Sequence, residues 1–138
     1  MLKKLTYIIA IIFTLILVGY QNAKPLFSSY QDNFEVYIGS SSSTAKIITV
    51  GKTDYPFMKR IKGESVKICA NGFDAYQVFE DYNAQIIFIE TVGDTVCYYG
   101  YSKDIKYLEV IGGRKINLQV AITGNSVTVG SPIIYGSF

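Results

Sequence analysis

The sequence predicts an α+β fold: an antiparallel β-meander sheet with one main amphipathic helix packed on a face, preceded by an N-terminal hydrophobic leader helix. Three observations lead to this prediction. Short runs of alternating apolar and polar residues recur along the chain, turn residues separate them, and a single stretch repeats aromatic residues every three positions. Connections as short as these leave little room for the crossovers that a parallel sheet needs.

Residues 1–23 have the composition of a signal peptide or an N-terminal membrane anchor. Lys3 and Lys4 precede an uncharged run from Leu5 to Tyr20, which favours an N-terminus left in the cytoplasm. This run exceeds the roughly 7–15 residues of a typical signal-peptide core and falls short of the ~20 of a spanning helix. Cleavage after residues 21–23 and retention therefore both stay open. Because Tyr20 stands where a lipobox requires cysteine, lipidation is excluded.

The exported part is expected to begin with a polar tether at residues 24–33, where Pro25 opposes regular structure. We expect residues 34–138 to form the α+β domain. Its first strand is predicted at 34–38, because Phe34, Val36 and Ile38 alternate with polar neighbours.

The next segments follow from turn residues and from the same alternation. A flexible turn at 39–43 leads to a returning strand at 46–50. Residues 51–63, which contain Pro56, are expected to be a loop, and a third strand is expected at 64–70.

One segment has the pattern of a helix. Asn71 is a suitable N-cap, and Asp74 follows it in capping-box spacing. Apolar and aromatic side chains then recur every three residues at Phe73, Tyr76, Phe79 and Tyr82. We expect an amphipathic helix of about three turns that ends near Asn83 and packs on the sheet.

After the helix the chain is expected to be all strand. The strands are predicted at 85–92, 95–102, 107–111 and 116–122, with a last one beginning near Val127. In the fourth of these, apolar residues alternate with Asn117, Gln119 and Ala121, which are expected to face outward. Pro132 marks the end of the last strand or an edge position.

The composition excludes several functions. The chain has 13 basic and 11 acidic residues; without Lys3 and Lys4 the exported part has 11 of each, so we expect no nucleic-acid partner. It has no histidine, no phosphate-binding glycine loop and no nucleophile elbow. We therefore predict no catalytic residue, no metal site and no cofactor.

Cys69 and Cys97 are the two cysteines. In an exported domain they can form one disulfide, or they can be two thiols that pack as small apolar residues. The sequence leaves both alternatives open.

Tyrosine is the unusual component, with 12 residues and no tryptophan. The alternation places Tyr99 and Tyr101 on one face of their strand. Tyrosine is enriched at recognition surfaces, although it also suits half-buried strands. We take Tyr99, Tyr101, Asn117 and Gln119 as the candidate binding residues on the sheet face opposite the helix.

The C-terminal half resembles a known family. The strings YNAQIIFIE, YYGYS, GGRKINLQVAI and GSPII resemble, in order and spacing, the YwmB-type exported proteins of spore-forming bacteria, which have a TATA-box-binding-protein-like fold. The resemblance covers about Asn83 to Ile134, and Ile122 and Thr123 stand where the family has Arg and Tyr. It implies an exported helix-on-sheet fold of a single lobe, and no catalytic residues can be carried over from the family.

These observations predict a non-catalytic extracytoplasmic interaction or binding module of the bacterial cell envelope, membrane-anchored or secreted. Its partner would be an envelope protein or a cell-wall polymer, with self-association through a sheet edge as a further expectation, and with membrane contact through the N-terminal segment if this is uncleaved. The alternative is a small carboxylate-dependent cell-wall hydrolase using Glu90 and Asp94.

Overall fold

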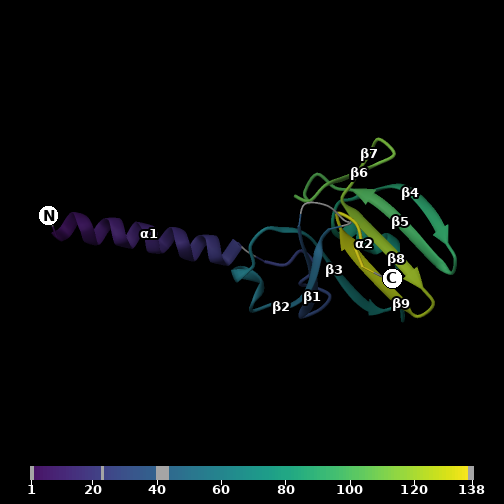
Figure 1. Ribbon diagram of the computed structural model, residues 1–138, viewed down its shortest axis with the longest axis horizontal. Helices are drawn as coiled ribbons and strands as arrows, with labels where there is room; N and C mark the ends of the chain where they lie inside the picture. Colours follow the sequence, from purple (N-terminus) through teal and green to yellow (C-terminus); the bar gives the residue numbers. More distant parts are fainter. Residues whose placement is uncertain (1, 23, 40–43, 137–138) are drawn as a thin grey trace.

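The structure is a computed structural model that describes residues 2–22, 24–39 and 44–136. Most of the turn expected at 39–43, and Ala23 of the expected cleavage site, lie outside these residues. The described part has α+β architecture (Figure 1), as predicted. Its helices are α1 (Leu2–Asn22), the 3₁₀ turn η1 (Tyr55–Phe57) and α2 (Ala75–Asp81). Its strands are β1 (Asn33–Ile38), β2 (Lys46–Gly51), β3 (Ile61–Cys69), β4 (Gln85–Val92), β5 (Thr95–Tyr101), β6 (Glu109–Ile111), β7 (Arg114–Ile116), β8 (Leu118–Thr123) and β9 (Ser126–Ser131).

Seven strands form one antiparallel sheet in the order β2-β1-β3-β9-β8-β5-β4. This order is not a simple meander, because β3 pairs with the last strand of the chain instead of its sequence neighbour β4. The register runs without a shift from β3 to β5: Ser65 lies opposite Gly130, Gly130 opposite Gln119, and Gln119 opposite Tyr99. The central strands β3, β9 and β8 therefore bring the two halves of the chain together.

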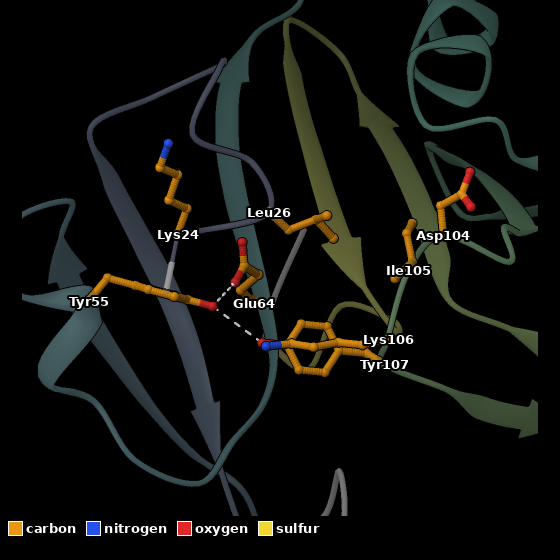
Figure 2. A pocket seen from close by; sticks show the side chains of 8 residues that line it. All are labelled: Lys24, Leu26, Tyr55, Glu64, Asp104, Ile105, Lys106 and Tyr107. Carbon is orange, nitrogen blue, oxygen red and sulfur yellow. Dashed lines mark hydrogen bonds between the residues drawn. The ribbon is translucent and has the colours of Figure 1, made fainter. Parts of the chain in front are cut away.

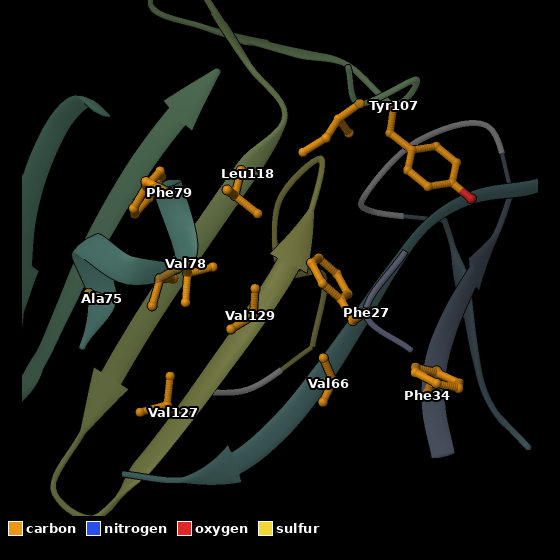
Figure 3. Packing of buried hydrophobic residues seen from close by; sticks show 12 residues of the cluster. Phe27, Phe34, Val66, Ala75, Val78, Phe79, Tyr107, Leu118, Val127 and Val129 are labelled. Carbon is orange, nitrogen blue, oxygen red and sulfur yellow. The ribbon is translucent and has the colours of Figure 1, made fainter. Parts of the chain in front are cut away.

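One face of the sheet carries the main hydrophobic core (Figure 3). Ala75, Val78 and Phe79 of α2 are buried against it. The sheet contributes Val66, Leu118, Val120, Val127 and Val129, all at most 2% exposed. Phe27 packs on the same face and is fully buried. Residues 24–33, expected to be a tether, thus supply part of the core.

The opposite face is covered as well, by the segment that follows β9. Ile134 packs with Cys97, Tyr99 and Ala121 in a second cluster, and its backbone N–H donates to Gln119 Oε1 at 2.8 Å. A Cβ atom at Gly130 would lie 2.6 Å from the Ile134 side chain, so this position has no room for a larger residue. The C-terminal segment therefore closes the face that the sequence analysis expected to be open.

Two predicted boundaries differ from the structure. Helix α2 begins at Ala75, because the Asp74 carboxylate accepts the Tyr76 N–H at 2.9 Å and acts as the N-cap in place of Asn71. Strand β3 begins at Ile61 within the expected loop, because its first residues pair with the end of β1. The helix is consequently shorter, and the strand longer, than alternation alone predicts.

A separate two-stranded sheet is found where the sequence predicted one strand at 107–111 and the start of another at 116–122. Strands β6 and β7 pair with each other, and Asn117 lies between β7 and β8. The Asn117 side chain accepts the Ser102 N–H and donates to the carbonyl oxygens of Ser102 and Ile105. One asparagine thus fixes both ends of the segment that joins β5 to β8.

Cys69 and Cys97 are both free thiols, the first exposed and the second buried. They lie on β3 and β5, and β9 and β8 run between these strands. Three strand spacings of about 4.8 Å far exceed the roughly 7 Å that a disulfide allows between Cα atoms. This fold does not allow the disulfide.

Helix α1 projects away from the domain beside β1 and β2 (Figure 1). Every side chain from Lys3 to Val18 is exposed. Among the described residues, no helix reaches the length and apolarity required to cross a membrane.

The contact between α2 and β5 gives a test of the fold. A Cβ atom at Gly100 would lie 2.5 Å from the Phe79 ring and 2.7 Å from the Gln85 carbonyl oxygen. We expect Gly100→Ala to lower the free energy of unfolding by about 1–3 kcal/mol through overpacking, measured by urea denaturation. Gly51→Ala is the matched control, because its Cβ would lie no closer than 3.6 Å to any atom outside its neighbours. Equal stability of the two variants would contradict this packing.

Candidate functional site

A cavity of about 220 Å³ lies where the segment after α1 crosses the sheet (Figure 2). Four parts of the chain build it: the residues after α1, the turn η1, strand β3 and the loop before β6. The lining combines a buried carboxylate, two tyrosine hydroxyls and two lysines, and consists of Lys24, Leu26, Tyr55, Glu64, Asp104, Ile105, Lys106 and Tyr107.

Glu64 is the central residue of this cavity and is fully buried. Its Oε1 accepts the Phe27 N–H at 3.1 Å, and its Oε2 accepts the Tyr55 hydroxyl at 2.5 Å. Burial raises the pKa of the Glu64 carboxyl, and these hydrogen bonds together with the charge of Lys106 oppose the rise only in part. The folded protein therefore holds the Glu64 proton more tightly than the unfolded chain does.

The two tyrosine hydroxyls extend this network. Tyr55 Oη lies 3.3 Å from Tyr107 Oη, and Figure 2 shows the Tyr55 hydroxyl between Glu64 and Tyr107. Burial raises the pKa of Tyr107 to about 12 and raises that of Tyr55 further, since Tyr55 also faces the Glu64 carboxylate. Both hydroxyls stay protonated at physiological pH and act as hydrogen-bond donors.

Lysines occupy the rim of the cavity. The Lys106 ammonium lies 4.8 Å from the centre of the Tyr107 ring, in cation–π geometry. Lys24 is exposed, and its ammonium points away from Glu64 in Figure 2. The rim therefore carries two cations and the exposed carboxylate of Asp104, while the buried Glu64 carboxylate is bonded to the protein itself.

This arrangement is poorly suited to proton transfer. A general acid or base must reach the proton of a bound molecule, but both oxygens of Glu64 bond protein donors and the side chain has no exposed surface. Asp104, the second carboxylate of the cavity lining, points away from Glu64 (Figure 2). The geometry supports a role for Glu64 in fixing the segment after α1 to the sheet.

The predicted binding residues lie together at the expected strands, yet they form no open surface. Asn117 and Gln119 are 1% and 2% exposed, so the expectation that they face outward is wrong. Tyr99 is buried, stacks on Phe88 at 4.4 Å between ring centres and donates to Glu90 Oε1 at 2.6 Å. Tyr101, at the end of β5, is partly exposed.

The polar groups of this face serve internal contacts. Gln119 bonds the backbone of Ile134, and the Ser131 hydroxyl donates to the Asn117 carbonyl oxygen at 2.6 Å. Ala121, also expected to face outward, is buried in the second cluster. Of the residues selected as binding residues, Gln119 and Tyr99 therefore hold the C-terminal segment on the sheet through their side chains, and Asn117 does so through its backbone carbonyl.

The acids of the alternative prediction lie on the far edge of the sheet. Glu90 is exposed on β4, where it accepts the Tyr99 hydroxyl, and Asp94 is exposed in the turn before β5. Within the described ranges, no three Cys, Asp or Glu side chains come together as a metal-binding group.

Sequence reasoning missed Glu64 as a site residue. Residues 63–66 are all buried, so the alternation that normally separates inward from outward side chains fails there. Both faces of β3 are covered at this point, by Phe27 on one side and Pro132 on the other. Only tertiary packing distinguishes Glu64 from an exposed strand glutamate.

The raised pKa of Glu64 predicts a pH dependence of stability. Because the folded state binds this proton more tightly, Glu64 stabilises the fold most below about pH 4, and this contribution falls as pH rises through the raised pKa. In Glu64→Gln this fall should disappear, since an amide does not titrate and can still accept from Phe27 and donate to Tyr55. Urea unfolding of the full chain in mild detergent between pH 4 and 8 measures the difference.

Glu64→Ala is the comparison variant. It leaves two buried donors without an acceptor, which costs about 1–3 kcal/mol for each, so it should be less stable than Glu64→Gln at every pH. Parallel pH profiles of the wild type and Glu64→Gln would contradict the assignment.

Comparisons with protein-family models, with curated proteins and with solved structures find no match to this chain. The resemblance of residues 83–134 to the YwmB-type proteins therefore stays a prediction.

Proposed function

We propose that this chain is a non-catalytic interaction module of the bacterial cell envelope, which works on the outer side of the cytoplasmic membrane. The observation that carries the proposal is the exposure of the apolar side chains of α1. Leu5, Phe13 and Leu15 are 57%, 61% and 66% exposed. A continuous apolar surface of this size calls for a non-aqueous partner. For a leader helix, this non-aqueous partner is the lipid bilayer or the export machinery.

The charge next to this helix sets its direction. Lys3 and Lys4 stand at its start, and positive residues are retained on the cytoplasmic side. The domain that follows α1 is then delivered to the outside. The resemblance of residues 83–134 to an exported family supports the same location.

Within the domain, α2 acts as the amphipathic helix of the proposed fold. Its apolar residues Ala75, Val78 and Phe79 lie on the sheet side, while Gln77 and Glu80 are exposed. The helix covers a face of the sheet and leaves the strand edges uncovered.

We place the partner at strand β4. Among the strands that the structure describes, β4 pairs only with β5 and forms one edge of the sheet. Ile89 and Val92 on this strand are 49% and 54% exposed. An edge strand offers unpaired backbone N–H and C=O groups to an added strand, and apolar side chains next to them supply contact area. The partner would be an extended segment of an envelope protein.

The location has a direct test in the native thiols. Cys69 is exposed and Cys97 is buried, so a maleimide that does not cross membranes should react with Cys69 in intact bacterial cells that express the full chain. We expect labelling of intact cells to equal that of lysed cells, detected by gel shift after brief treatment with a phosphine reductant.

Cys69→Ser is the control for the site of labelling and should abolish it. Lys3→Glu with Lys4→Glu should reduce the labelled fraction in intact cells, because the orienting charge is reversed. Labelling of the unchanged chain that requires lysis would contradict export.

The edge-strand partner is tested by photo-crosslinking in cells. A photoreactive residue in place of Val92 should yield one dominant protein adduct, identified by mass spectrometry. Adding Ile89→Lys to the same chain should suppress this adduct, because a charged side chain on an edge strand opposes strand addition.

A photoreactive residue in place of Gln77 is the matched control, because Gln77 is exposed on α2 away from the edge. Equal adduct patterns from the two positions, or an adduct that Ile89→Lys leaves unchanged, would refute β4 as the binding edge.

A further inference from the structure

The domain has no net charge, but its charges are unevenly distributed along the chain. Residues 24–67 contain seven basic and four acidic side chains. Residues 68–102 contain five acidic side chains and no basic one. The seven basic residues of the first range and the five acidic residues of the second are all exposed. The basic residues are Lys24, Lys46, Lys52, Lys59, Arg60, Lys62 and Lys67, and the acidic ones are Asp74, Glu80, Asp81, Glu90 and Asp94.

Two of these acidic residues, Glu90 and Asp94, lie at the opposite end of the domain from β1 and β2. Figure 1 shows β1 and β2 beside the end of α1, and shows β4 and β5 at the far side of the sheet. The contacts agree with this view. Lys24, two residues after α1 ends, lines the same cavity as Tyr55 of η1, and the Lys52 ammonium donates to the Ser28 carbonyl oxygen at 3.2 Å. The segment that carries Lys52, Lys59 and Arg60 therefore lies around the base of α1.

Most of these cations are not neutralised inside the protein. In the described part of the chain, the one ion pair joins Lys52 to Asp32 at 3.5 Å. Lys24, Lys59, Arg60 and Lys62 are exposed and form no ion pair with any described residue. We call these four residues the basic collar. Their charge is available to an external anion.

We propose that the basic collar docks on an anionic phospholipid surface beside the point where α1 meets the membrane. The inference rests on the proposed function, with α1 retained in the mature protein. Clustered lysines and arginines next to a membrane segment are attracted to anionic headgroups over about a Debye length, ~8 Å at physiological salt. A lipid surface is the partner that the geometry favours, because the collar lies beside the base of an apolar helix.

The acidic end strengthens the orienting effect. Glu90 on β4 and Asp94 in the turn before β5 are repelled by the same surface and lie on the side of the sheet farthest from α1. Asp81 of α2 lies closer to α1, since it accepts a hydrogen bond from Tyr30 in the segment that follows α1. The domain therefore stands with its acidic end away from the membrane. Strand β4 is then presented outward, where the proposed partner can reach it.

The test measures the distance between the collar and the lipid in the full chain. In a Cys69→Ser background, Thr53→Cys places an environment-sensitive dye on an exposed residue next to the collar, and Gln77→Cys places it on α2. Vesicles of phosphatidylcholine, with or without phosphatidylglycerol, carry a headgroup-level quencher lipid. We expect strong quenching at position 53 only with phosphatidylglycerol, and little quenching at position 77. The quenching at position 53 should be lost at about 1 M salt, where the Debye length is ~3 Å.

A charge-reversal pair supplies the matched control. Lys59→Glu with Lys62→Glu should lower the ratio of docked to undocked domains at least about tenfold, since each basic residue changes anionic-surface binding by roughly fivefold. Lys103→Glu with Lys115→Glu makes the same change in net charge outside the collar and should have little effect. Equal quenching on both kinds of vesicle, or equal effects of the two reversals, would overturn the docking.

Sedimentation with the vesicles separates this inference from the proposed function. If the chain binds both vesicle types and quenching at position 53 is the same on both, the role of α1 is retained and docking of the basic collar is refuted. Binding to anionic vesicles alone, with quenching at position 53, would keep the collar and refute the role of α1, and binding to neither would refute both. Soluble polyphosphate is then added at the same concentration of phosphate groups as the anionic lipid. If it releases the collar from the vesicles, the lipid surface is refuted as the partner and a wall polymer is favoured.

Discussion

The burial of one carboxylate governs how the parts of this domain meet. Glu64 lies on the central strand β3 and accepts hydrogen bonds from the backbone after α1 and from Tyr55 of η1, which in turn contacts Tyr107 before β6. A buried carboxylate without these donors would be strongly unfavourable. The three segments are therefore held in place by the requirement that Glu64 be satisfied.

The sequence predicted the local structure well where one periodicity dominated. Strand β4 was located from its dense run of apolar residues, the strand ending at Ile38 from alternation, and the helical region from the spacing of its aromatic side chains. The helix start was misplaced because Asn71 and Asp74 are both good caps, and only the Asp74 side chain meets the free N–H group of Tyr76.

The candidate site could not be predicted, for a different reason. Asn117 and Gln119 have the pattern of outward residues on a half-exposed strand, and they are buried because residues after Pro132 fold back over that face. Glu64 is hidden in the same way by Phe27. In both cases the covering segment is distant in sequence and irregular in structure, so no periodic pattern in the sequence predicts it. The uneven charge, by contrast, was present in the sequence, but it became informative only once α1 and β4 were placed at opposite ends.

The short sheet β6–β7 has a consequence for how the chain can vary. Strands β5 and β8 are antiparallel neighbours, and Gly100 lies opposite Leu118, so residues 102–117 are an excursion between two strands that a tight turn could join directly. Asn117 closes the base of this excursion through bonds to Ser102 and Ile105, and Gly112 and Gly113 form its tip. Changes of length at the tip leave the base intact. The tip of the excursion is thus the natural place in this domain to graft a foreign peptide, an epitope tag or a reporter.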